Sequence, residues 1–536
     1  MKFFNFDNSN DVEEIKKQKF NNLNMLFLIF AIFSIVIFSI AVSPVELQND
    51  TFYTIKIGKY IIENGIDMMD HFSWHDNLPY TYPHWAYDVC IYLVYNIAGF
   101  AGIYISTIVL AIILGFAIFF INKNLNKSNV ISFIIAIISL YLLKDYIAAR
   151  AQLVTFILFI LAAFCIEKFT RGNSKKLYGT ILIVISLLIA NIHVAVWPFL
   201  FILFLPYFAE QFIIWFYNLK IMGKFREKQT NKNNYKITFE KNKNVKYLVI
   251  VLIISVLMGF ITPLKDVPFT YLYKTMIGNT TQSINEHLPL TLIQNIPIMI
   301  LMISVILVLM LTKVKISFKD FCMVFGLMIL CFISKRQTSL FVVIGNIYIT
   351  AILVNSLKNN EILNIKNLDK FGMSILGILI TLILVILISW LNIKEKIFDK
   401  YINENNYPVE ATKYIEDTLI KQIGVENLRL FNEYNYGSYL LLNDIPVFID
   451  SRADLYAPEF NGTKNNEGIY EGRDIFSDFI NVSSMNTYYE LIFDKYDINY
   501  VIIYKTSKLN IILCRDDNYE PKYIDDNFVI YQRKGI

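Results

Sequence analysis

The feature that most constrains this chain is a series of eleven apolar runs separated by short polar loops. A helix that crosses a bilayer needs ~20 mostly apolar residues, and several of the runs approach that length. Apolar residues make up 55% of the chain, charged residues 18%, and mean hydropathy is +0.46, which excludes an ordinary soluble protein. We therefore expect a mainly α, polytopic membrane protein with about eleven transmembrane helices. The runs lie at residues 23–43, 99–121, 129–143, 151–167, 177–191, 193–216, 245–261, 291–312, 320–333, 337–357 and 371–391.

Charge in the loops predicts how the chain sits in a plasma membrane. One alternate set of loops holds 25 Lys and Arg and the other only 8. Cytoplasmic loops carry the excess of basic residues, so the first set and the N-terminus are predicted to be cytoplasmic. Loop 217–246, with nine basic residues, is the strongest single indication. The first set comprises 1–22, 122–128, 168–176, 217–246, 313–319 and 358–370, and the second 44–84, 144–150, 191–193, 262–290 and 334–336.

Residues 400–536 differ in composition from the rest. Short apolar runs alternate with polar turns, and helical patterns lie between them at 409–422 and 486–494. We expect a small extracytoplasmic α/β domain there, after a transmembrane domain at 1–399 that includes a first outer loop at 44–98. The expected strands are 429–431, 446–449, 500–504 and 528–531.

All five histidines fall in the loops predicted to be outside. Those loops hold 83 of the 536 residues, so random placement would put fewer than one histidine there. Either the histidines simply avoid lipid, or the outer face carries a catalytic surface. The net charge of +4 is too small to indicate a nucleic-acid partner. The five residues are His71, His75, His84, His193 and His287.

The first outer loop carries the densest set of polar residues. Asp50 directly follows the first span, where it suits the N-cap of a helix and also a general base at the lipid–water boundary. Asp70 and His71, with His84 further on, are either a solvated loop or ligands for a divalent metal such as Mg²⁺ or Mn²⁺. His84 and Asp88 are four residues apart, on one face of a helix expected to reach about residue 100.

Later outer loops bring further polar groups to the same membrane face. Arg150 and Arg336 are either interface anchors or phosphate-binding residues, because a guanidinium holds phosphate through two hydrogen bonds. His193 joins two spans, and Glu286 with His287 lies in the fourth outer loop. We take these five, with His84 and Asp88, as candidate substrate-binding residues.

Taken in order, these motifs resemble the GT-C superfamily of polytopic glycosyltransferases, in particular the bacterial branch related to dolichyl-phosphate-mannose protein mannosyltransferases. The likeness covers nearly the whole chain. Three departures stand out: the family often has Glu at position 88, Pro at 151 and Gly at 438. The motifs are Asp50 with Gly58; Gly65 and Asp70-His71-Phe-Ser; His84-Trp85 with Asp88; Gly99; Ala149-Arg150-Ala-Gln152-Leu; Asn191-Ile-His193; Thr262-Pro263; Ile284-Asn-Glu286-His287; Arg336; Gly437-Ser-Tyr-Leu; and Val447-Phe-Ile-Asp450-Ser-Arg452-Ala-Asp454-Leu-Tyr456.

The resemblance implies a membrane glycosyltransferase. Its donor would be a sugar on a polyprenyl phosphate at the outer leaflet, and its acceptor a glycan, lipid or protein. Asp50 would be the catalytic base, basic residues from later loops would hold the phosphate, and transfer would invert the anomeric centre. Asp70 and His71 are further catalytic candidates, since a retaining route needs a second carboxylate.

Two other functions remain open: a lipid-linked glycan polymerase or ligase, and a polyprenyl-linked glycan transporter or flippase. The short run 177–191, with Pro198 soon after it, is a hint of the broken helices that transporters use. The segment Asp450-Ser-Arg452-Ala-Asp454 either binds acceptor or ties a turn together, and we favour the structural role.

Overall fold

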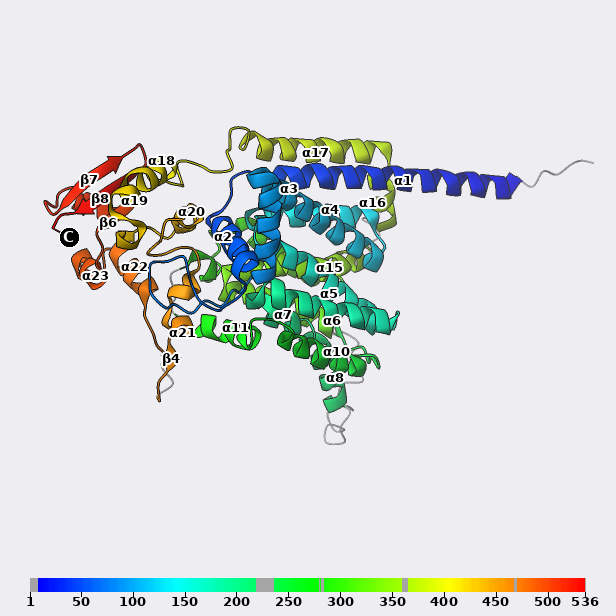
Figure 1. Cartoon of the computed structure of the whole chain (residues 1–536). Helices are drawn as coiled ribbons and strands as arrows, with labels where there is room; N and C mark the ends of the chain where they lie inside the picture. The colour runs from blue at the N-terminus through cyan, green and yellow to red at the C-terminus, as the bar shows by residue number, and fades with distance from the viewer. Residues whose placement is uncertain are drawn as a thin grey trace, which may run out of the picture.

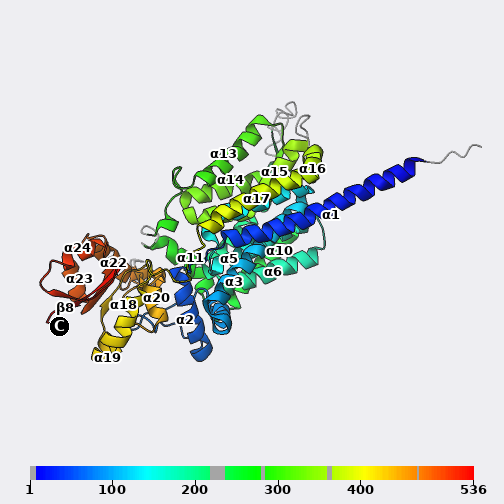
Figure 2. The same cartoon turned by 90° about the horizontal axis from the view of Figure 1, so that it is seen from above.

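A computed structural model of the chain describes residues 8–217, 236–278, 280, 284–358, 365–466 and 470–535, with side chains from residue 22 onward. A bundle of long helices forms one part, and a mixed α/β region covers one end of it (Figures 1 and 2). The bundle helices are α1 (Asn8–Val42), α3 (Trp85–Asn126), α4 (Asn129–Leu142), α5 (Ala151–Thr170), α6 (Lys175–Ile192), α7 (Trp197–Ile202), α8 (Leu205–Tyr217), α10 (Val245–Leu257), α11 (Val267–Ile277), α13 (Ile296–Leu311), α14 (Phe318–Ile333), α15 (Thr338–Lys358), α16 (Ile365–Gly372) and α17 (Ile375–Lys394).

Each of the eleven apolar runs contains a helix, and seven segments within the described ranges are long and apolar enough to cross a membrane. The chain is therefore a multi-pass membrane protein, while the count of eleven crossings stays a prediction. The expected run 193–216 is interrupted, because a 3₁₀ turn (Val194–Val196) precedes α7 and α8. Most of the nine-charge loop 217–246 lies outside the described residues.

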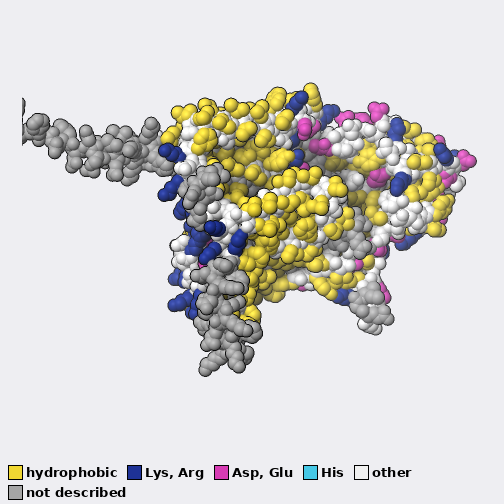
Figure 3. Space-filling model, turned by 180° about the vertical axis from the view of Figure 1, so that it is seen from behind, with side chains coloured by type: hydrophobic (Ala, Val, Ile, Leu, Met, Phe, Trp, Pro, Cys, Tyr) yellow, Lys and Arg dark blue, Asp and Glu magenta, His cyan; other side chains and the backbone are white. Residues whose placement is uncertain are grey.

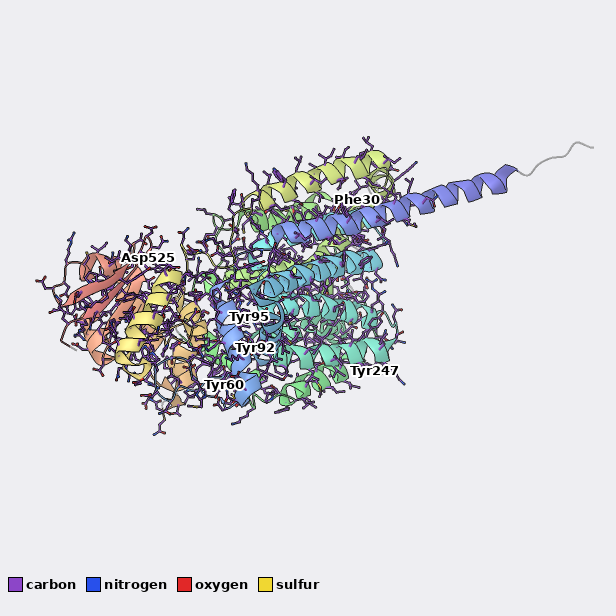
Figure 4. The ribbon with its side chains drawn as sticks, turned by 45° about the horizontal axis from the view of Figure 1, so that its top comes forward. Phe30, Tyr60, Tyr92, Tyr95, Tyr247 and Asp525 are labelled. Carbon is purple, nitrogen blue, oxygen red and sulfur yellow. The ribbon has the colours of Figure 1, made fainter. Side chains whose placement is uncertain are left out.

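The surface separates by side-chain type. On the face that Figure 3 shows, a broad apolar band covers the bundle, and Lys and Arg gather at the end away from the α/β region. Exposed apolar area of this extent is what lipid would cover. Tyr60, Tyr92 and Tyr95 lie at the end of the bundle nearer the α/β region, and Tyr247 lies at the basic end (Figure 4). Tyrosines near the two ends of the band are typical of membrane interfaces.

The α/β region is built on a four-stranded mixed sheet in the order β3-β6-β8-β7. The strands are β3 (Leu430–Phe431), β6 (Tyr500–Tyr504), β7 (Tyr519–Ile524) and β8 (Phe528–Arg533). Strand β3 is parallel to β6, and the other pairs are antiparallel. The helices are α18 (Val409–Tyr414), which continues through a π turn (Ile415–Leu419) into α19 (Ile420–Ile423), then α20 (Gly437–Leu442), α21 (Pro458–Asn461), α22 (Ile475–Ser483), α23 (Tyr489–Lys495) and α24 (Lys508–Leu513).

Two-residue strands form two further pairs, β1 (Ile237–Thr238) with β2 (Ile316–Ser317) and β4 (Thr463–Lys464) with β5 (Tyr470–Glu471). The expected strand at 446–449 is wrong. Val447 makes only an isolated bridge to Ser73 of the first loop, so this segment pairs outside the sheet.

The first outer loop and the α/β region share one hydrophobic core, separate from the core of the bundle. Helix α2 (Asn49–Asn64) packs Phe52 against Tyr407 and Tyr439, and the Trp74 indole donates to the carbonyl of Leu430 at 3.0 Å. Because the first outer loop and the α/β region contribute to one core, packing against the α/β region fixes the position of α2.

Two glycines set the course of the chain around α2. A Cβ on Gly58 would meet the carbonyl oxygen of Asp88 at 2.1 Å, so only glycine allows α2 and α3 to approach so closely. Gly99 has φ +58°, which breaks α3 between its first segment and the long span. The expected short helix from residue 84 to about 100 is thus the first segment of α3.

Candidate active site

A cavity of about 820 Å³ opens where the first loop, the bundle and the α/β region meet. Its wall gathers polar side chains from segments that are far apart in the sequence. From the bundle side these include Asp50, His84, Arg150, His193, Glu286, His287 and Arg336, and from the α/β side Glu433, Tyr434, Ser451, Asp454, Phe476, Phe479 and Lys508.

Arg150 lies between two carboxylates in this wall. Its Nε is 2.9 Å from Oδ2 of Asp50, and its Nη1 is 3.2 Å from Oε1 of Glu286. Burial alone would raise the pKa of Glu286, but the charges of Arg150 and Arg336, with a hydrogen bond from Arg150, together lower it. Asp50 and Glu286 in turn raise the pKa of Arg150 against the effect of its burial. We call this set the Asp50–Arg150–Glu286 bridge.

Asp50 is not the N-cap of α2, as one interpretation of the sequence expected. The N-cap is Gln48, and Asp50 stands in the first turn of the helix. A carboxylate is favoured there by the helix dipole. The Asp50 side chain therefore does not cap the helix. It lines the cavity and lies beside Arg150.

Two histidine rings lie in contact in the same cavity wall, tilted to one another by 59°. The rings of His84 and His193 are 4.8 Å apart, and Nδ1 of His193 is 3.4 Å from the Thr155 hydroxyl. The pKa of His84 is lowered to about 3 by burial and by the charges of Arg336 and Arg150. The pKa of His193 is lowered by burial and by the charges of His84, Arg336 and Arg150. Both rings are therefore neutral at physiological pH. Nε2 of His193 is buried without a hydrogen-bond partner in the described part of the chain, so this side of the cavity holds an unused polar group.

Arg336 completes the cationic side of the cavity. It lies in a 3₁₀ turn (Lys335–Gln337) just before α15, and it forms no ion pair with any described carboxylate. Burial and the charge of Arg336 together lower the pKa of nearby His287 to about 4. A guanidinium without a carboxylate partner, beside neutral histidines, is a site that favours an anion such as phosphate.

Asp70 and His71 do not reach this cavity. The carboxylate of Asp70 pairs with Nη1 of Arg452 at 2.5 Å and accepts from the Ser73 hydroxyl at 2.6 Å. His71 lies 2.6 Å from Asp67 and stacks on Tyr60. Arg452 borders the cavity, but Asp70 and His71 do not, so their positions do not support the predicted catalytic roles.

The expected metal ligands Asp70, His71 and His84 do not come together. His84 lines the cavity, whereas the other two face different partners. Within the described ranges, no group of three or more His, Cys, Asp or Glu side chains is arranged to hold a metal ion. Four carboxyl groups line the cavity, those of Asp50, Glu286, Glu433 and Asp454. The guanidinium of Arg150 stands between Asp50 and Glu286, so these two do not fit a divalent metal between them.

Asp88, another predicted substrate-binding residue, is fully buried in the contact of α3 with α2 and is absent from the cavity wall. The first loop instead contributes residues that the sequence analysis did not select, Asn49, Tyr53 and Tyr80. The hydroxyl of Tyr80 and Oδ1 of Asn49 are buried without a hydrogen-bond partner among described residues. Tyr53 and Tyr80 are two of 34 tyrosines in the chain, so nothing in the sequence distinguished them from the others.

Asp450 and Arg452 belong to a buried ion network. Arg452 donates to both oxygens of Asp450 and to Asp70, and the Tyr456 hydroxyl donates to Asp450 at 2.6 Å. Asp450 and Arg452 thus hold this segment together, through a partner in the first loop that was not foreseen. Ser451 and Asp454 of the same segment line the cavity, so acceptor binding by this segment stays a prediction.

No protein-family model matches the sequence, and neither does any curated protein sequence. Solved structures of the oligosaccharyltransferase from the archaeon Archaeoglobus fulgidus do match the fold. The apo form superposes with a TM-score of 0.56 at 11% identity, covering 89% of this chain and 69% of that one. The same enzyme with an inhibitory peptide and a dolichol-phosphate gives 0.54, and with a tethered acceptor peptide 0.53, at the same identity and coverage. The chain thus shares the fold of this archaeal oligosaccharyltransferase over most of its length.

Proposed function

We propose that this protein is a membrane glycosyltransferase that moves a sugar or glycan from a polyprenyl-phosphate-linked donor to an acceptor in the cavity. The observation that carries the proposal is the Asp50–Arg150–Glu286 bridge, which lines the same cavity as Arg336, a cation that forms no ion pair with the described residues. A base and cations in one cavity are what transfer from a phosphate leaving group requires. The shared fold with an oligosaccharyltransferase supports the same class of reaction.

In the proposed reaction Asp50 removes the proton of the acceptor hydroxyl as that oxygen bonds to the anomeric carbon. The bond from the anomeric carbon to the phosphate oxygen breaks, and the electron pair leaves with the polyprenyl phosphate. Positioned proton transfer contributes about 10²–10⁴-fold to rate. Direct attack by the acceptor inverts the anomeric centre, and one base suffices for it.

Arg336 and Arg150 would stabilise the departing phosphate. Arg336 forms no ion pair among the described residues, so it is available to an incoming anion. Arg150 is held by Asp50 and Glu286, and a phosphate would compete for its guanidinium. We propose that donor binding draws Arg150 toward the phosphate and leaves Asp50 free to act as the base.

The acceptor is proposed to enter from the α/β side. That part of the wall carries the aromatic rings of Tyr434, Phe476 and Phe479 with the hydroxyls of Ser451 and Ser483. The donor's lipid chain would approach from the bundle, whose apolar surface suits it. The basic end of the bundle lies opposite the cavity, so the positive-inside rule supports an extracytoplasmic site, with the N-terminus cytoplasmic and the α/β domain outside.

The two rival functions predict other behaviour. A ligase or polymerase would require a diphosphate-linked glycan rather than a monophosphate-linked sugar. In a transporter, the interruption of the helices near His193 would form part of the substrate pathway. Here the 3₁₀ turn after His193 places its side chain in the cavity wall, beside His84. We therefore favour transfer over transport.

The test is incorporation of label from a panel of radiolabelled polyprenyl-phosphate sugars and polyprenyl-diphosphate glycans, in membranes containing the full chain. We expect transfer from a monophosphate donor. Transfer from diphosphate-linked glycans alone would replace the proposal with a ligase. No transfer from any donor, with flipping of a labelled lipid-linked glycan, would replace it with a transporter.

A further inference from the structure

A second cavity, of about 1140 Å³, lies at the end of the bundle opposite the active-site cavity. It is formed where the end of α3 and the start of α4 meet α1 and α16, and Figures 1 and 2 place α16 at that end. Segments distant in sequence meet here, so the cavity is made by the fold and not by a local run of charge. It is lined by Leu23, Asn24, Phe120, Lys123, Asn124, Lys127, Asn129, Lys366, Asp369, Lys370 and Met373.

The charge of this cavity is strongly positive. Among the described residues that line it, four are lysines and one, Asp369, is a carboxylate. That carboxylate is already engaged, because it accepts from the Ser128 hydroxyl at 2.8 Å and from the backbone N–H of Val130 at 3.3 Å. In the described part of the chain, Lys123, Lys127 and Lys370 form no ion pair. The described lining of the cavity therefore carries an excess of positive charge, which favours an anion.

The lysines come from the end of α3 and from α16. Lys366 and Lys370 are four residues apart on α16, so they lie on one face of that helix. Lys123 lies in the last turn of α3, and Lys127 is the left-handed C-cap that ends it. The side-chain amides of Asn24, Asn124 and Asn129 add hydrogen-bonding groups around them. This arrangement suits the several oxygens of a phosphate group.

The apolar part of the cavity distinguishes an amphiphile from a free ion. Leu23, Phe120 and Met373 line it, and Phe120 is 41% exposed. The residues that follow Asn24 along α1, Met25 and Leu26, are also exposed, on the apolar surface of the bundle. A charged head in the cavity would thus lie beside a surface suited to acyl chains. A soluble phosphate would leave this apolar wall uncovered.

We propose that this cavity binds the phosphate-bearing headgroup of an anionic phospholipid, in the leaflet opposite the active-site cavity. Basic pockets between helices at the cytoplasmic side of membrane proteins bind such headgroups. The volume is ample, since ligand sites commonly enclose ~300–1,000 Å³. The site is separate from the active-site cavity and requires none of its residues.

The test is native mass spectrometry of the full chain in detergent, titrated with phosphatidylglycerol or with phosphatidylcholine of the same acyl chains. We expect one retained phosphatidylglycerol, and at least tenfold weaker retention in the Lys123→Gln/Lys366→Gln/Lys370→Gln variant. The control, Lys168→Gln/Lys175→Gln/Lys246→Gln, removes equal charge at the same end outside the cavity and should retain the lipid. Equal retention by both variants, or equal retention of the two lipids by the wild type, would overturn the proposal.

Two further measurements keep the result decisive if the triple variant folds poorly. Acetylation of Lys370 in the wild type should slow at least threefold in phosphatidylglycerol vesicles relative to phosphatidylcholine, after normalising to Lys175 outside the cavity. An unchanged normalised rate would contradict the proposal. Soluble glycerol 3-phosphate should not displace the bound lipid at equal concentration; displacement would show that the site takes a soluble phosphate instead.

Discussion

Two arginines in the outer part of this molecule each bridge two carboxylates, and the two bridges differ in access to solvent. In the Asp50–Arg150–Glu286 bridge the side chains of Arg150 and Asp50 are 27% and 25% exposed, and the bridge lines a cavity. In the Asp70–Arg452–Asp450 bridge the side chains of Arg452 and Asp70 are 2% and 0% exposed. A sealed bridge can only hold the fold together, whereas an open one can exchange partners with a substrate. The two bridges contain the same types of residue. Their difference in exposure therefore distinguishes the bridge with a structural role from the bridge with the proposed catalytic role.

The largest expected effect comes from breaking the sealed bridge. Arg452→Ala would leave Asp70 and Asp450 buried without their partner, which costs about 3–5 kcal/mol in the free energy of unfolding. Arg150→Ala should cost clearly less, because its carboxylates reach solvent. The measurement is unfolding of both variants by SDS titration from detergent. Equal losses for the two variants would remove the distinction between the bridges.

The next effect concerns the cation that has no carboxylate partner. Arg336→Gln should lower the rate of sugar transfer about 10²–10³-fold, the usual cost of losing one group that stabilises developing charge. Its melting temperature should stay near that of the wild type, since the side chain forms no ion pair with described residues. Lys265→Gln, in the same predicted outer loop set but absent from the cavity wall, serves as the control. A rate within twofold of the wild type would exclude Arg336 from the phosphate site.

A smaller effect should come from Glu433, a cavity carboxyl that has no arginine partner among described residues. Burial raises its pKa to about 7. A raised folded-state pKa stabilises the fold fully below the unfolded value, ~4.3, and this contribution is lost as the pH rises through about 7. Glu433→Gln should therefore gain melting temperature relative to the wild type between pH 5 and 8. Parallel pH curves for the two proteins would contradict this assignment.

The smallest expected effect is that of chelation. The guanidinium of Arg150 stands between Asp50 and Glu286, so transfer should keep its rate, within twofold, after exhaustive treatment with EDTA. Assays before and after readdition of Mg²⁺ or Mn²⁺ would measure this. Loss of activity with recovery on readdition would show that the carboxylates hold a metal in the working enzyme.

The sequence predicted the helices of the bundle and several polar residues of the cavity wall, for a simple physical reason. Apolar periodicity is local, and polar side chains at the ends of spans must gather at the membrane face. Asp50, Arg150 and Glu286, selected from three separate loops, therefore lie together in the cavity wall, while their catalytic and binding roles stay predictions.

The failures share a different cause. Asp70, His71 and His84 are neighbours in sequence, and this proximity suggested a metal site, but Asp70 instead pairs with Arg452, 382 positions away. Likewise the segment 446–449 reads as a strand of the α/β sheet, yet its bridge is to Ser73. Such long-range contacts depend on how the first outer loop docks onto the α/β region. A local sequence pattern does not predict them.

The most direct test of the account compares Asp50→Asn with Glu63→Gln, which removes an exposed carboxylate at the other end of the same helix. Both variants would be assayed for transfer of labelled sugar in membranes, with melting temperatures confirming that each is folded. The account predicts that Asp50→Asn loses about 10²–10⁴-fold in rate while Glu63→Gln keeps its rate. Wild-type transfer by folded Asp50→Asn would contradict it, because the cavity would then need a different base.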